Sequence, residues 1–330
     1  MEDRKKDHIN LALDSQTLKD EIDRRFWYEP LLSPHPTQLT PFTFLGKQLK
    51  APLWVSSMTG GTQLAGKINR NLAKVCNEFC FGMGLGSCRI ILKDNTHFAD
   101  FDMRPVIGDD LPLYANLGIA QMEELVTSNQ THVANDLVKR LRADGLIIHV
   151  NPLQEWFQPE GDRLQLAPLY TIQKFLEKAE FPVIVKEVGQ GMGPQSLLQL
   201  MKLPLAAVEF AAFGGTNFAR MEMKRNPDAE IASLFSPLTT VGVDAGDMLE
   251  AVNVIAGNSK DILCKEVIVS GGIKSFLDGF YYIQKSKLPA VYGQASEFLK
   301  YAREDYAVLQ QYVKNQIKGL EMAFAYLQIR

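Results

Sequence analysis

The stretch Leu146-Ile-Ile-His-Val-Asn-Pro-Leu-Gln-Glu155 combines a strand pattern with a cluster of polar side chains. Its apolar and β-branched residues predict a short buried strand, because nothing in residues 146–148 needs water. Four polar side chains occupy the end of this run: His149, Asn151, Gln154 and Glu155. Burial of polar groups costs free energy that packing alone does not require, so we expect this strand end to face a ligand. The alternative is a capped strand-to-helix turn in which Asn151 and Glu155 are solvated.

Short apolar runs of the same kind recur from residue 51 onward. They predict eight strands, at residues 53–57, 81–85, 113–116, 146–150, 183–186, 207–210, 267–270 and 290–292. Helical patterns lie between them, at residues 65–80, 123–141, 169–179, 196–201 and 275–286. Alternating strands and helices indicate a parallel sheet with crossover helices. Eight repeats favour a closed (β/α)8 TIM barrel over an open doubly wound sheet.

Three segments stand outside the repeat. Residues 1–50 are irregular and rich in proline, and we predict that they form an N-terminal arm packed on the barrel. The long interval 211–266 predicts an insertion between the sixth and seventh strands. Residues 302–327 predict one long helix. The whole chain, 1–330, is expected to form a single domain.

Composition narrows the class of protein. The chain carries a net charge of −3 over 330 residues, so it lacks the basic field that grips nucleic acid. Its four cysteines show neither C-x-x-C pairs nor histidine partners at zinc spacing, which indicates reduced thiols. The N-terminus has no apolar signal segment, and no apolar run is long enough to span a membrane. These features predict a soluble, cytoplasmic protein.

The predicted barrel places functional groups at the carboxyl ends of its strands. Glycine, hydroxyl, amide or charged residues occupy those ends: Ser57-Met58-Thr59-Gly60-Gly61, Gly86-Ser87-Cys88-Arg89, Asn116-Leu117-Gly118, Lys186-Glu187-Val188-Gly189, Phe213-Gly214-Gly215-Thr216-Asn217, Ser270-Gly271-Gly272-Ile273-Lys274 and Gly293-Gln294-Ala295. The last two groups have the position of a barrel phosphate site, because glycine turns offer N–H groups to phosphate. Two ordinary tight turns are the alternative.

Lys186 ends a Val-Ile-Val strand and points toward the barrel mouth. A buried lysine there needs an anion or an electron-rich ring, and near N1 of a flavin it would stabilise the reduced, anionic ring. Two alternatives remain open: a Schiff-base lysine and an ion pair with Glu187. The phosphate signals favour the flavin.

A second anion site and a metal site are weaker predictions. Arg4, Lys5, His8 and Arg89 together suit a diphosphate, although a solvated N-terminal charge cluster is the commoner arrangement. Glu155 suits Mg²⁺, which takes one or two carboxylates plus substrate phosphate oxygens. Glu160 and Asp162, nearby, are expected to be solvated.

Taken in order, five motifs resemble the type 2, FMN-dependent isopentenyl-diphosphate delta-isomerases. They are Arg4-Lys5-Lys6-Asp7-His8, Ser57-Met58-Thr59-Gly60-Gly61, His149-Val150-Asn151-Pro152-Leu153-Gln154-Glu155, Lys186-Glu187-Val188-Gly189 and Gly214-Gly215-Thr216. The resemblance covers nearly the whole chain. It implies a (β/α)8 barrel that interconverts isopentenyl and dimethylallyl diphosphate with reduced FMN and Mg²⁺, with NADPH as reductant. It also implies a homo-oligomer, a tetramer or an octamer.

The resemblance also implies residue roles. FMN contacts are implied for Ser57, Met58, Thr59, Ser87, Asn116, Lys186, Thr216, Gly271, Gly272, Gln294 and Ala295. Substrate contacts are implied for Arg4, Lys5, His8, Ser87, Arg89, His149, Asn151 and Gln154. Catalytic roles are implied for Gln154 and His149, with Gln154 beside the alkene, and Mg²⁺ binding for Glu155. Flavin N5 is the favoured acid–base group, because an amide such as Gln154 is not a strong base.

The chain departs from the family pattern in four places. They are Phe210-Ala211-Ala212-Phe213, Gln294, Ser275-Phe276 and Met221-Glu222-Met223-Lys224. Two other functions remain as alternatives. One is an FMN oxidoreductase of the 2-hydroxy-acid oxidase or IMP-dehydrogenase-like barrel class, which needs a His–Arg pair or a loop cysteine such as Cys88. The other is a barrel that binds flavin or phosphate as a sensor or scaffold.

Overall fold

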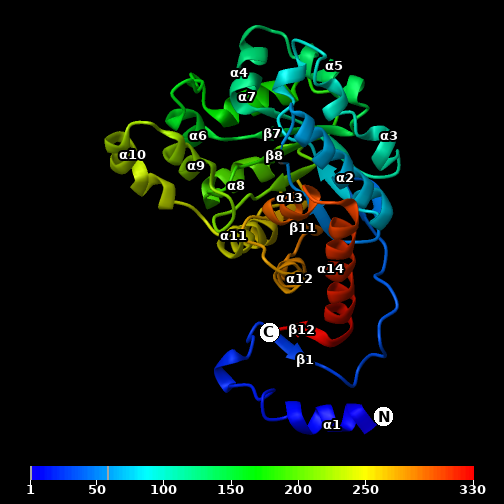
Figure 1. The fold of residues 1–330 in the computed structure, drawn as a ribbon. Coiled ribbons are helices and arrows are strands. Elements are labelled where there is room, and N and C mark those ends of the chain that lie inside the picture. Colours follow the sequence, from blue (N-terminus) through cyan, green and yellow to red (C-terminus); the bar gives the residue numbers. More distant parts are fainter. Residues whose placement is uncertain (1, 58) are drawn as a thin grey trace.

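Eight parallel strands close into a barrel in this computed structural model, which describes residues 2–57 and 59–330. The order around the barrel is β10-β11-β4-β5-β6-β7-β8-β9. The strands are β4 (Leu53–Val55), β5 (Gly82–Gly84), β6 (Leu113–Gly118), β7 (Gly145–His149), β8 (Val183–Lys186), β9 (Ala207–Glu209), β10 (Val267–Ser270) and β11 (Ala290–Gln294). Each coincides with a predicted strand, so the (β/α)8 fold class is confirmed (Figure 1).

Helices surround the barrel and cover its strands (Figure 1). They are α2 (Gln63–Phe79), α3 (Arg104–Ile107), α4 (Ile119–Thr127), α5 (His132–Leu141), α6 (Pro152–Phe157), α7 (Pro168–Leu176), α8 (Pro194–Met201), α11 (Ala245–Asn258), α12 (Phe276–Lys285), α13 (Ser296–Ala302) and α14 (Tyr306–Tyr326). Short 3-10 turns follow β5: η2 (Arg89–Ile91) and η3 (Phe98–Asp100). The predicted insertion after β9 contains α9 (Phe218–Arg225), α10 (Ala229–Phe235) and η4 (Ser236–Thr240).

The long helix predicted over residues 123–141 is divided, and that prediction was wrong, whereas the one predicted over 302–327 is confirmed as α14 with a later start. The segment 123–141 is broken between α4 and α5, where Asn129 takes a left-handed φ of 58°. The segment 302–327 begins with the end of α13, and α14 starts only after Asp305, its N-cap residue. In the segment 123–141 apolar residues keep their helical spacing on either side of a short turn, so periodicity alone does not reveal the break.

Large aromatic residues fill the barrel, and glycine makes room for them. Trp54 and Tyr114 are fully buried and meet edge to face, with ring centroids 6.1 Å apart. A Cβ atom on Gly82 would lie 2.5 Å from the Trp54 ring, so a side chain at that position would collide with it. Close packing of this kind holds the strand ends, and the side chains they carry, in one arrangement.

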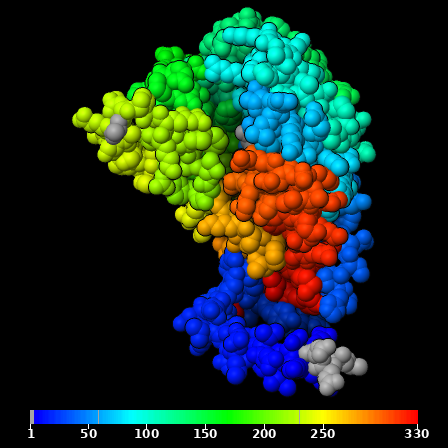
Figure 2. All heavy atoms as spheres, viewed as in Figure 1, coloured from blue at the N-terminus to red at the C-terminus, as the bar shows by residue number. Residues whose placement is uncertain are grey.

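The N-terminal arm divides into an exposed part and a packed part. The exposed part contains α1 (Glu2–Leu11) and η1 (Lys19–Glu21); every residue from 4 to 24 is exposed. The packed part contains β1 (Phe26–Tyr28), which pairs with β12 (Leu327–Ile329), and the hairpin of β2 (Phe42–Phe44) and β3 (Lys47–Leu49). Figure 2 shows the exposed part as a separate lobe beyond the barrel.

Residues 4–24 are exposed, and their packing on the barrel stays a prediction. The first six residues of α1, Glu2 to Asp7, are all charged, but Ile9, Leu13 and Leu18 further along are apolar and exposed as well. Packing begins at Phe26, which is buried against Phe280 and Tyr281. Among residues 2–57 and 59–330, no helix has the length and apolar composition needed to cross a membrane.

A candidate ligand site at the carboxyl ends of the strands

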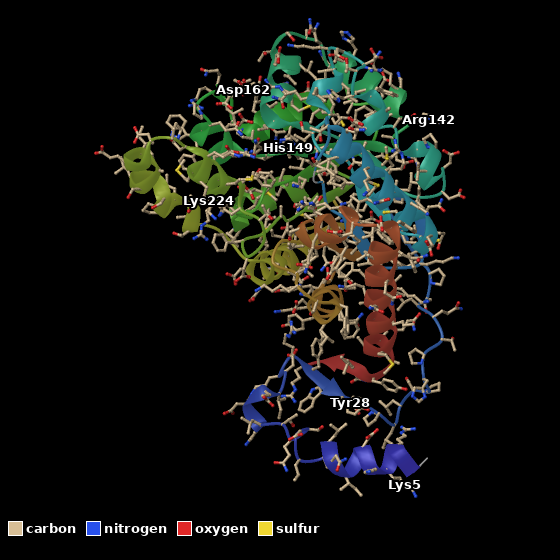
Figure 3. The ribbon with its side chains drawn as sticks, in the orientation of Figure 1. Lys5, Tyr28, Arg142, His149, Asp162 and Lys224 are labelled. Carbon is tan, nitrogen blue, oxygen red and sulfur yellow. The ribbon has the colours of Figure 1, made fainter. Side chains whose placement is uncertain are left out.

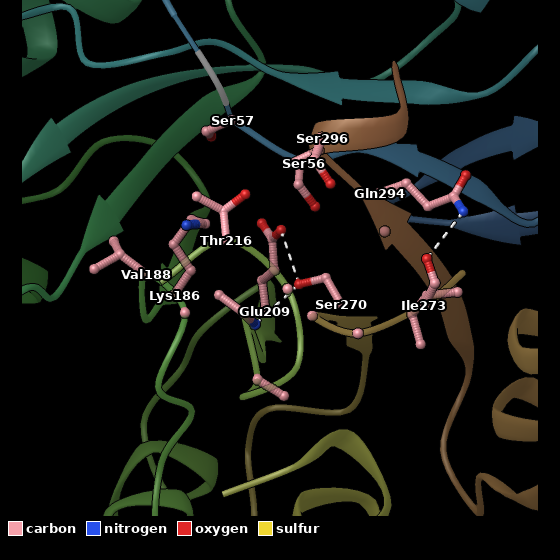
Figure 4. A pocket seen from close by; sticks show the side chains of 18 of the residues that line it. Ser56, Ser57, Lys186, Val188, Glu209, Thr216, Ser270, Ile273, Gln294 and Ser296 are labelled. Atoms are coloured by element: carbon pink, nitrogen blue, oxygen red, sulfur yellow. Dashed lines mark hydrogen bonds between the residues drawn. The ribbon is translucent and has the colours of Figure 1, made fainter. Parts of the chain in front are cut away.

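A cavity opens where β4, β8, β9, β10 and β11 end. Seven residues predicted to contact a flavin line it together: Ser57, Lys186, Thr216, Gly271, Gly272, Gln294 and Ala295. Figure 4 shows the side chains of four of them, which come from separate strands and loops: Ser57, Lys186, Thr216 and Gln294. The structure thus brings together positions that span more than two thirds of the chain.

Three oxygen atoms in this cavity lack a hydrogen-bond partner among the described residues. They are Ser56 Oγ, Ser57 Oγ and Glu209 Oε2, and each is buried. Leaving a buried polar atom unpaired costs on the order of 1–3 kcal/mol. A site that carries three of them side by side is built for a ligand with complementary polar groups.

Two glycine turns form one wall of the cavity. Gly271 and Gly272 have φ values of 92° and 74°, which only glycine adopts readily. A Cβ atom on Gly271 would lie 2.2 Å from the backbone nitrogen of Ala212. The turn after β10 is therefore pressed against the turn after β9, and both surfaces consist largely of backbone that can offer N–H groups to an anion.

Lys186 is buried in the same cavity. Its Nζ donates to the main-chain oxygen of Glu187 at 2.7 Å, and no carboxylate in the described part of the chain pairs with it. The Glu187 side chain points the other way, where the N–H groups of the loop from 189 to 191 donate to its Oε2. Burial raises the pKa of Glu187. The Lys186–Glu187 side-chain ion pair considered from the sequence is therefore not formed, and the Lys186 ammonium keeps two N–H groups for a ligand.

Gln294, one of the departures from the family pattern, has a structural position. Its Nε2 donates to the main-chain oxygen of Ile273 at 3.2 Å, and its Oε1 accepts from the Tyr312 hydroxyl at 2.9 Å. The amide therefore ties the glycine turn after β10 to helix α14. Ala211, another departure, takes a φ of 43°, a left-handed conformation that is strained for alanine.

His149 lies beside the cavity at the end of β7. Asn116 Nδ2 donates to the Leu85 main-chain oxygen, so Asn116 Oδ1 must accept from His149 Nδ1, 2.7 Å away. Burial and, to a lesser extent, the positive charge of Lys186 lower the pKa of His149 to about 3. The imidazole is therefore neutral at physiological pH, with its proton on Nδ1 and a free lone pair on Nε2.

A chain of hydrogen bonds continues from Asn151 along α6. Asn151 Nδ2 donates to Gln154 Oε1 at 3.1 Å and to Glu155 Oε1 at 2.9 Å. Gln154 Nε2 then donates to Glu222 Oε1 at 3.3 Å. These contacts fix which way each amide faces, so Gln154 is held at both ends before any substrate arrives.

Glu155 is buried and both of its carboxylate oxygens are engaged. Asn151 donates to Glu155 Oε1, and the main-chain N–H of Asp162 donates to Glu155 Oε2 at 2.9 Å. Asn151 Oδ1 next to it is buried without a partner among the described residues. Two neighbouring oxygen donors of this kind suit a hard cation such as Mg²⁺, although the described residues contain no group of three His, Cys, Asp or Glu around a common point.

Ser87 and Arg89 lie in a second depression, apart from the cavity at β8–β11. Arg89 is exposed, and its Nη1 pairs with Asp162 Oδ2 at 3.2 Å. Gln121 also donates to Asp162. Asp162 is partly exposed to solvent, as expected, and its carboxylate also links Arg89 to the loop after α6.

The remaining predicted residues lie elsewhere. Arg4, Lys5 and His8 are exposed on α1, and Figure 3 shows Lys5 at the far end of the molecule from His149. Thr59 is outside the cavity lining, with its main-chain oxygen accepting from Asn69. Met58 lies outside the described residues.

Two side chains at the candidate site were not singled out from the sequence. Glu209 lies in the predicted strand 207–210, where a carboxylate among apolar neighbours is itself a signal of a site. Glu222 lies within the insertion and is buried, where it accepts from Gln154, Gln158 and Arg225. Nothing in the local sequence around Glu222 indicates its partner 68 residues earlier.

Comparison with known proteins places the chain among curated relatives. No family model matches it. It is 36% identical over 304 residues to an isopentenyl-diphosphate delta-isomerase of Rickettsia akari (strain Hartford), covering 91% of this chain and 85% of that protein. It is 34% identical over 325 residues to the protein of the same name from Rickettsia felis, covering 97% and 91%.

Solved structures share the fold at low identity. A flavocytochrome b2 variant with benzoylformate superposes with a TM-score of 0.62 at 14% identity, covering 91% of this chain and 71% of that chain. A mandelate oxidase variant with a monooxide FMN adduct gives a TM-score of 0.57 at 12% identity, covering 93% and 88%. At such identities the likeness shows the barrel fold alone.

Proposed function

The chain belongs to the isopentenyl-diphosphate delta-isomerase family, and on that premise we propose that it interconverts isopentenyl and dimethylallyl diphosphate with bound reduced FMN and Mg²⁺. One observation carries the cofactor part of this proposal. A single cavity joins a buried, unpaired ammonium on Lys186 to the glycine turn at Gly271 and Gly272. A flavin phosphate suits the turn, and an electron-rich ring suits the lysine.

The residues present fit FMN. The unpartnered oxygens of Ser56, Ser57 and Glu209 match a ligand rich in polar groups, and the backbone-lined turn matches a phosphate. When bound and reduced, FMN would supply an electron-rich ring and the acid–base group for the allylic proton shift. Lys186 would hold negative charge on the pyrimidine side of that ring, because a buried cation is worth more than an exposed one.

The polar cluster at β7 and α6 would position the substrate. Gln154, fixed between Asn151 and Glu222, would present its amide to the alkene as a positioning group. His149, neutral and anchored by Asn116, would offer Nε2 as an acceptor without adding charge. A neutral lining matters, because protonation of the alkene creates positive charge that a nearby imidazolium would oppose.

Diphosphate and metal binding complete the proposal. Glu155 and Asn151 Oδ1 would face Mg²⁺, which also takes oxygens from the diphosphate. Arg89 and Ser87 would contact the diphosphate itself, and NADPH would serve as the reductant of the flavin. Diphosphate binding away from the alkene supplies orientation.

The basic residues of α1 need a separate test, because this chain holds them away from its own cavity. Arg4, Lys5 and His8 would reach the diphosphate of a second copy in a homo-oligomer. Deletion of residues 1–8 is expected to raise the substrate KM about tenfold with little change in kcat, as lost charge-assisted hydrogen bonds weaken binding. An unchanged KM would show that α1 has no part in substrate binding.

Among the described residues, Cys88, His149 and Arg89 do not fit the catalytic roles that the oxidoreductase alternative needs. Cys88 is fully buried, and burial raises the pKa of its thiol to about 12, so it is not a ready nucleophile. His149 bonds to Asn116 and Arg89 pairs with Asp162, so these two side chains do not form the His–Arg pair that a 2-hydroxy-acid oxidase uses.

The decisive experiment is an anaerobic assay with isopentenyl diphosphate, Mg²⁺ and FMN, followed by detection of dimethylallyl diphosphate. Product is expected only after dithionite or NADPH has reduced the flavin, and chelation of Mg²⁺ is expected to abolish it. FMN binding without product would instead favour a sensor or scaffold. Absence of FMN binding would overturn the site assignment.

A further inference from the structure

Resting on the proposed function, we propose that Glu209 selects the cofactor by accepting a hydrogen bond from a hydroxyl group of the ribityl chain of FMN. Glu209 ends β9 and is completely buried at the base of the cavity. Figure 4 shows its carboxylate pointing into the space between Ser56, Thr216 and Ser270. The names of the related proteins assign no role to Glu209.

Ser270 is hydrogen-bonded to one carboxylate oxygen of Glu209, and the other carboxylate oxygen has no partner among the described residues. The main-chain N–H of Ala211 donates to Ser270 Oγ at 2.9 Å, so that hydroxyl accepts from the backbone. Its single hydrogen must then go to Glu209 Oε1, 3.2 Å away. Ser270 therefore holds Glu209 by one oxygen and turns the carboxylate so that Oε2 remains without a partner.

No cation neutralises this carboxylate. Lys186 is the cross-strand neighbour of Glu209, yet the described residues contain no ion pair to Glu209 within 4.0 Å. A buried carboxylate without a cation or a second donor is costly. Its cost is offset when a ligand brings a donor to Oε2, so the cavity contains a place for an O–H or N–H group.

The chemistry of FMN identifies that donor. The phosphate carries negative charge and few hydrogens, so it would be repelled by Glu209 and belongs at the glycine turn of Gly271 and Gly272. The ring edge belongs near Lys186. Between these two places lies the ribityl chain, whose hydroxyl groups are donors.

Two further side chains support a polyhydroxylated ligand. Ser56 Oγ and Ser57 Oγ line the same cavity from the end of β4, across from β9, and neither has a partner in the described part of the chain. A serine hydroxyl can both donate and accept. Together with Glu209 they offer one obligate acceptor and two adaptable groups, which a chain of alcohols satisfies and an apolar linker does not.

The test measures binding of oxidised flavins to the apoprotein by quenching of flavin fluorescence, so it does not depend on activity. The probes are FMN, its 2′-, 3′- and 4′-deoxy analogues, and lumiflavin, which lacks the side chain. The variants are Glu209→Ala and Glu209→Gln. Glu123→Gln is the matched control, because Glu123 is a buried carboxylate outside the cavity whose two oxygens accept from the N–H groups of Gln165 and Leu166.

Glu209→Ala is expected to weaken FMN about 10- to 100-fold, the loss for a hydrogen bond to a charged group. Glu209→Gln keeps an acceptor oxygen and should weaken FMN less. One deoxy analogue should bind the wild type as weakly as FMN binds Glu209→Ala, and should lose nothing further in that variant. Lumiflavin should bind both proteins equally, and Glu123→Gln should bind FMN like the wild type.

Two results would overturn the proposal. If Glu209→Ala and the wild type bind FMN equally, the carboxylate takes no part in cofactor binding. If Glu209→Ala weakens lumiflavin and every analogue by the same factor, Glu209 only supports the fold. Failure of the wild type to bind any flavin would overturn the proposed function as well, so the two failures are distinguishable.

Discussion

Two neighbouring regions of the barrel mouth differ in whether their polar atoms have hydrogen-bond partners. The cavity over β4 and β8–β11 leaves Ser56, Ser57 and Glu209 with unpartnered oxygens. The cluster over β6, β7 and α6 joins nearly every polar atom to the next: His149 to Asn116, Asn151 to Gln154 and Gln154 to Glu222. Both regions lie at the carboxyl ends of the strands.

This difference separates two tasks. An unpaired buried oxygen costs free energy in the empty protein and is tolerated where a resident ligand completes the hydrogen bond. A network in which most amides and carboxylates satisfy one another costs less, although Asn151 Oδ1 has no partner among the described residues, and the network fixes the directions of its members in advance. We therefore assign the first region to a tightly held cofactor and the second to a substrate that comes and goes.

The largest expected effect is that of Lys186→Met on the cavity. Removal of the buried ammonium should lower turnover about 100- to 1,000-fold, as for loss of one preorganised electrostatic group. Reduced FMN should weaken about tenfold more than oxidised FMN, because only the reduced ring is anionic. A flavin potential lowered by about 30 mV would record this tenfold difference for two electrons. Lys174→Met, at an exposed lysine paired with Glu177, is the control.

If Lys186→Met weakened the binding of oxidised and reduced FMN equally, Lys186 would act as a packing residue. The electrostatic role that distinguishes the cavity from the amide cluster would then be contradicted. The lysine would also have to be reassigned if Lys174→Met had the same effect.

The next effect is expected in the amide cluster. Glu222→Leu removes the acceptor that holds Gln154 Nε2 and should lower kcat about 100-fold while the FMN Kd stays within twofold, because a misplaced group near the reacting atoms costs about that much. Glu222→Gln keeps an acceptor oxygen and should recover part of the loss. If Glu222→Leu lowered FMN affinity as well as kcat, the amide cluster and the cavity would be energetically coupled and would not be separate sites.

A smaller effect concerns the pH dependence of stability. The folded pKa of His149, about 3, lies below the value near 6.5 of an unfolded histidine. Between these two pKa values, His149 is therefore protonated in the unfolded chain and neutral in the folded protein. This stabilising contribution is fully present above pH 6.5 and is lost as the pH falls toward 3, by about 1 kcal/mol between pH 6.5 and 5.5.

Urea unfolding at these two pH values measures this effect. His149→Gln cannot titrate and should lose about 1 kcal/mol less than the wild type over the same interval. An identical pH dependence in the two proteins would mean that folding does not lower the pKa of His149, so the imidazole would become charged in the folded protein as the pH falls through this interval.

The smallest effect is that of Ala211→Gly in the turn beside the cavity. Glycine relieves the left-handed φ of 43° but adds disorder to the unfolded chain, so the net gain in unfolding free energy should be at most about 1 kcal/mol. FMN affinity should stay within a few-fold of the wild-type value. A large loss of affinity would show that the alanine methyl group itself contacts the cofactor.

Much of the fold could be predicted from sequence because its signals are local. Eight apolar runs separated by helical patterns specify strands and crossover helices, and all eight strands form where they were expected. Breaks inside helices were missed, since the turn at Asn129 leaves the apolar spacing intact. The exposure of residues 4–24 was not predicted, since Ile9, Leu13 and Leu18 are apolar and yet exposed.

The candidate site was predictable only in part. The carboxyl-end rule of the barrel fold places Ser57, Lys186, Gly271 and Gln294 at one mouth, and they do line one cavity. The same rule does not separate this cavity from the depression at Ser87 and Arg89, because which strand ends adjoin depends on how the barrel closes.

By itself the sequence determined the barrel, the end of it that carries the chemistry, and the residue types available there, since these follow from periodicity and from chain order. Only the tertiary structure decided which of those side chains meet. Glu222 reaches Gln154 across 68 residues, and Ser270 turns Glu209 into the cavity from a strand 61 residues later. Such pairs depend on the register of neighbouring strands and on the path of an inserted segment, and neither leaves a local trace in the chain.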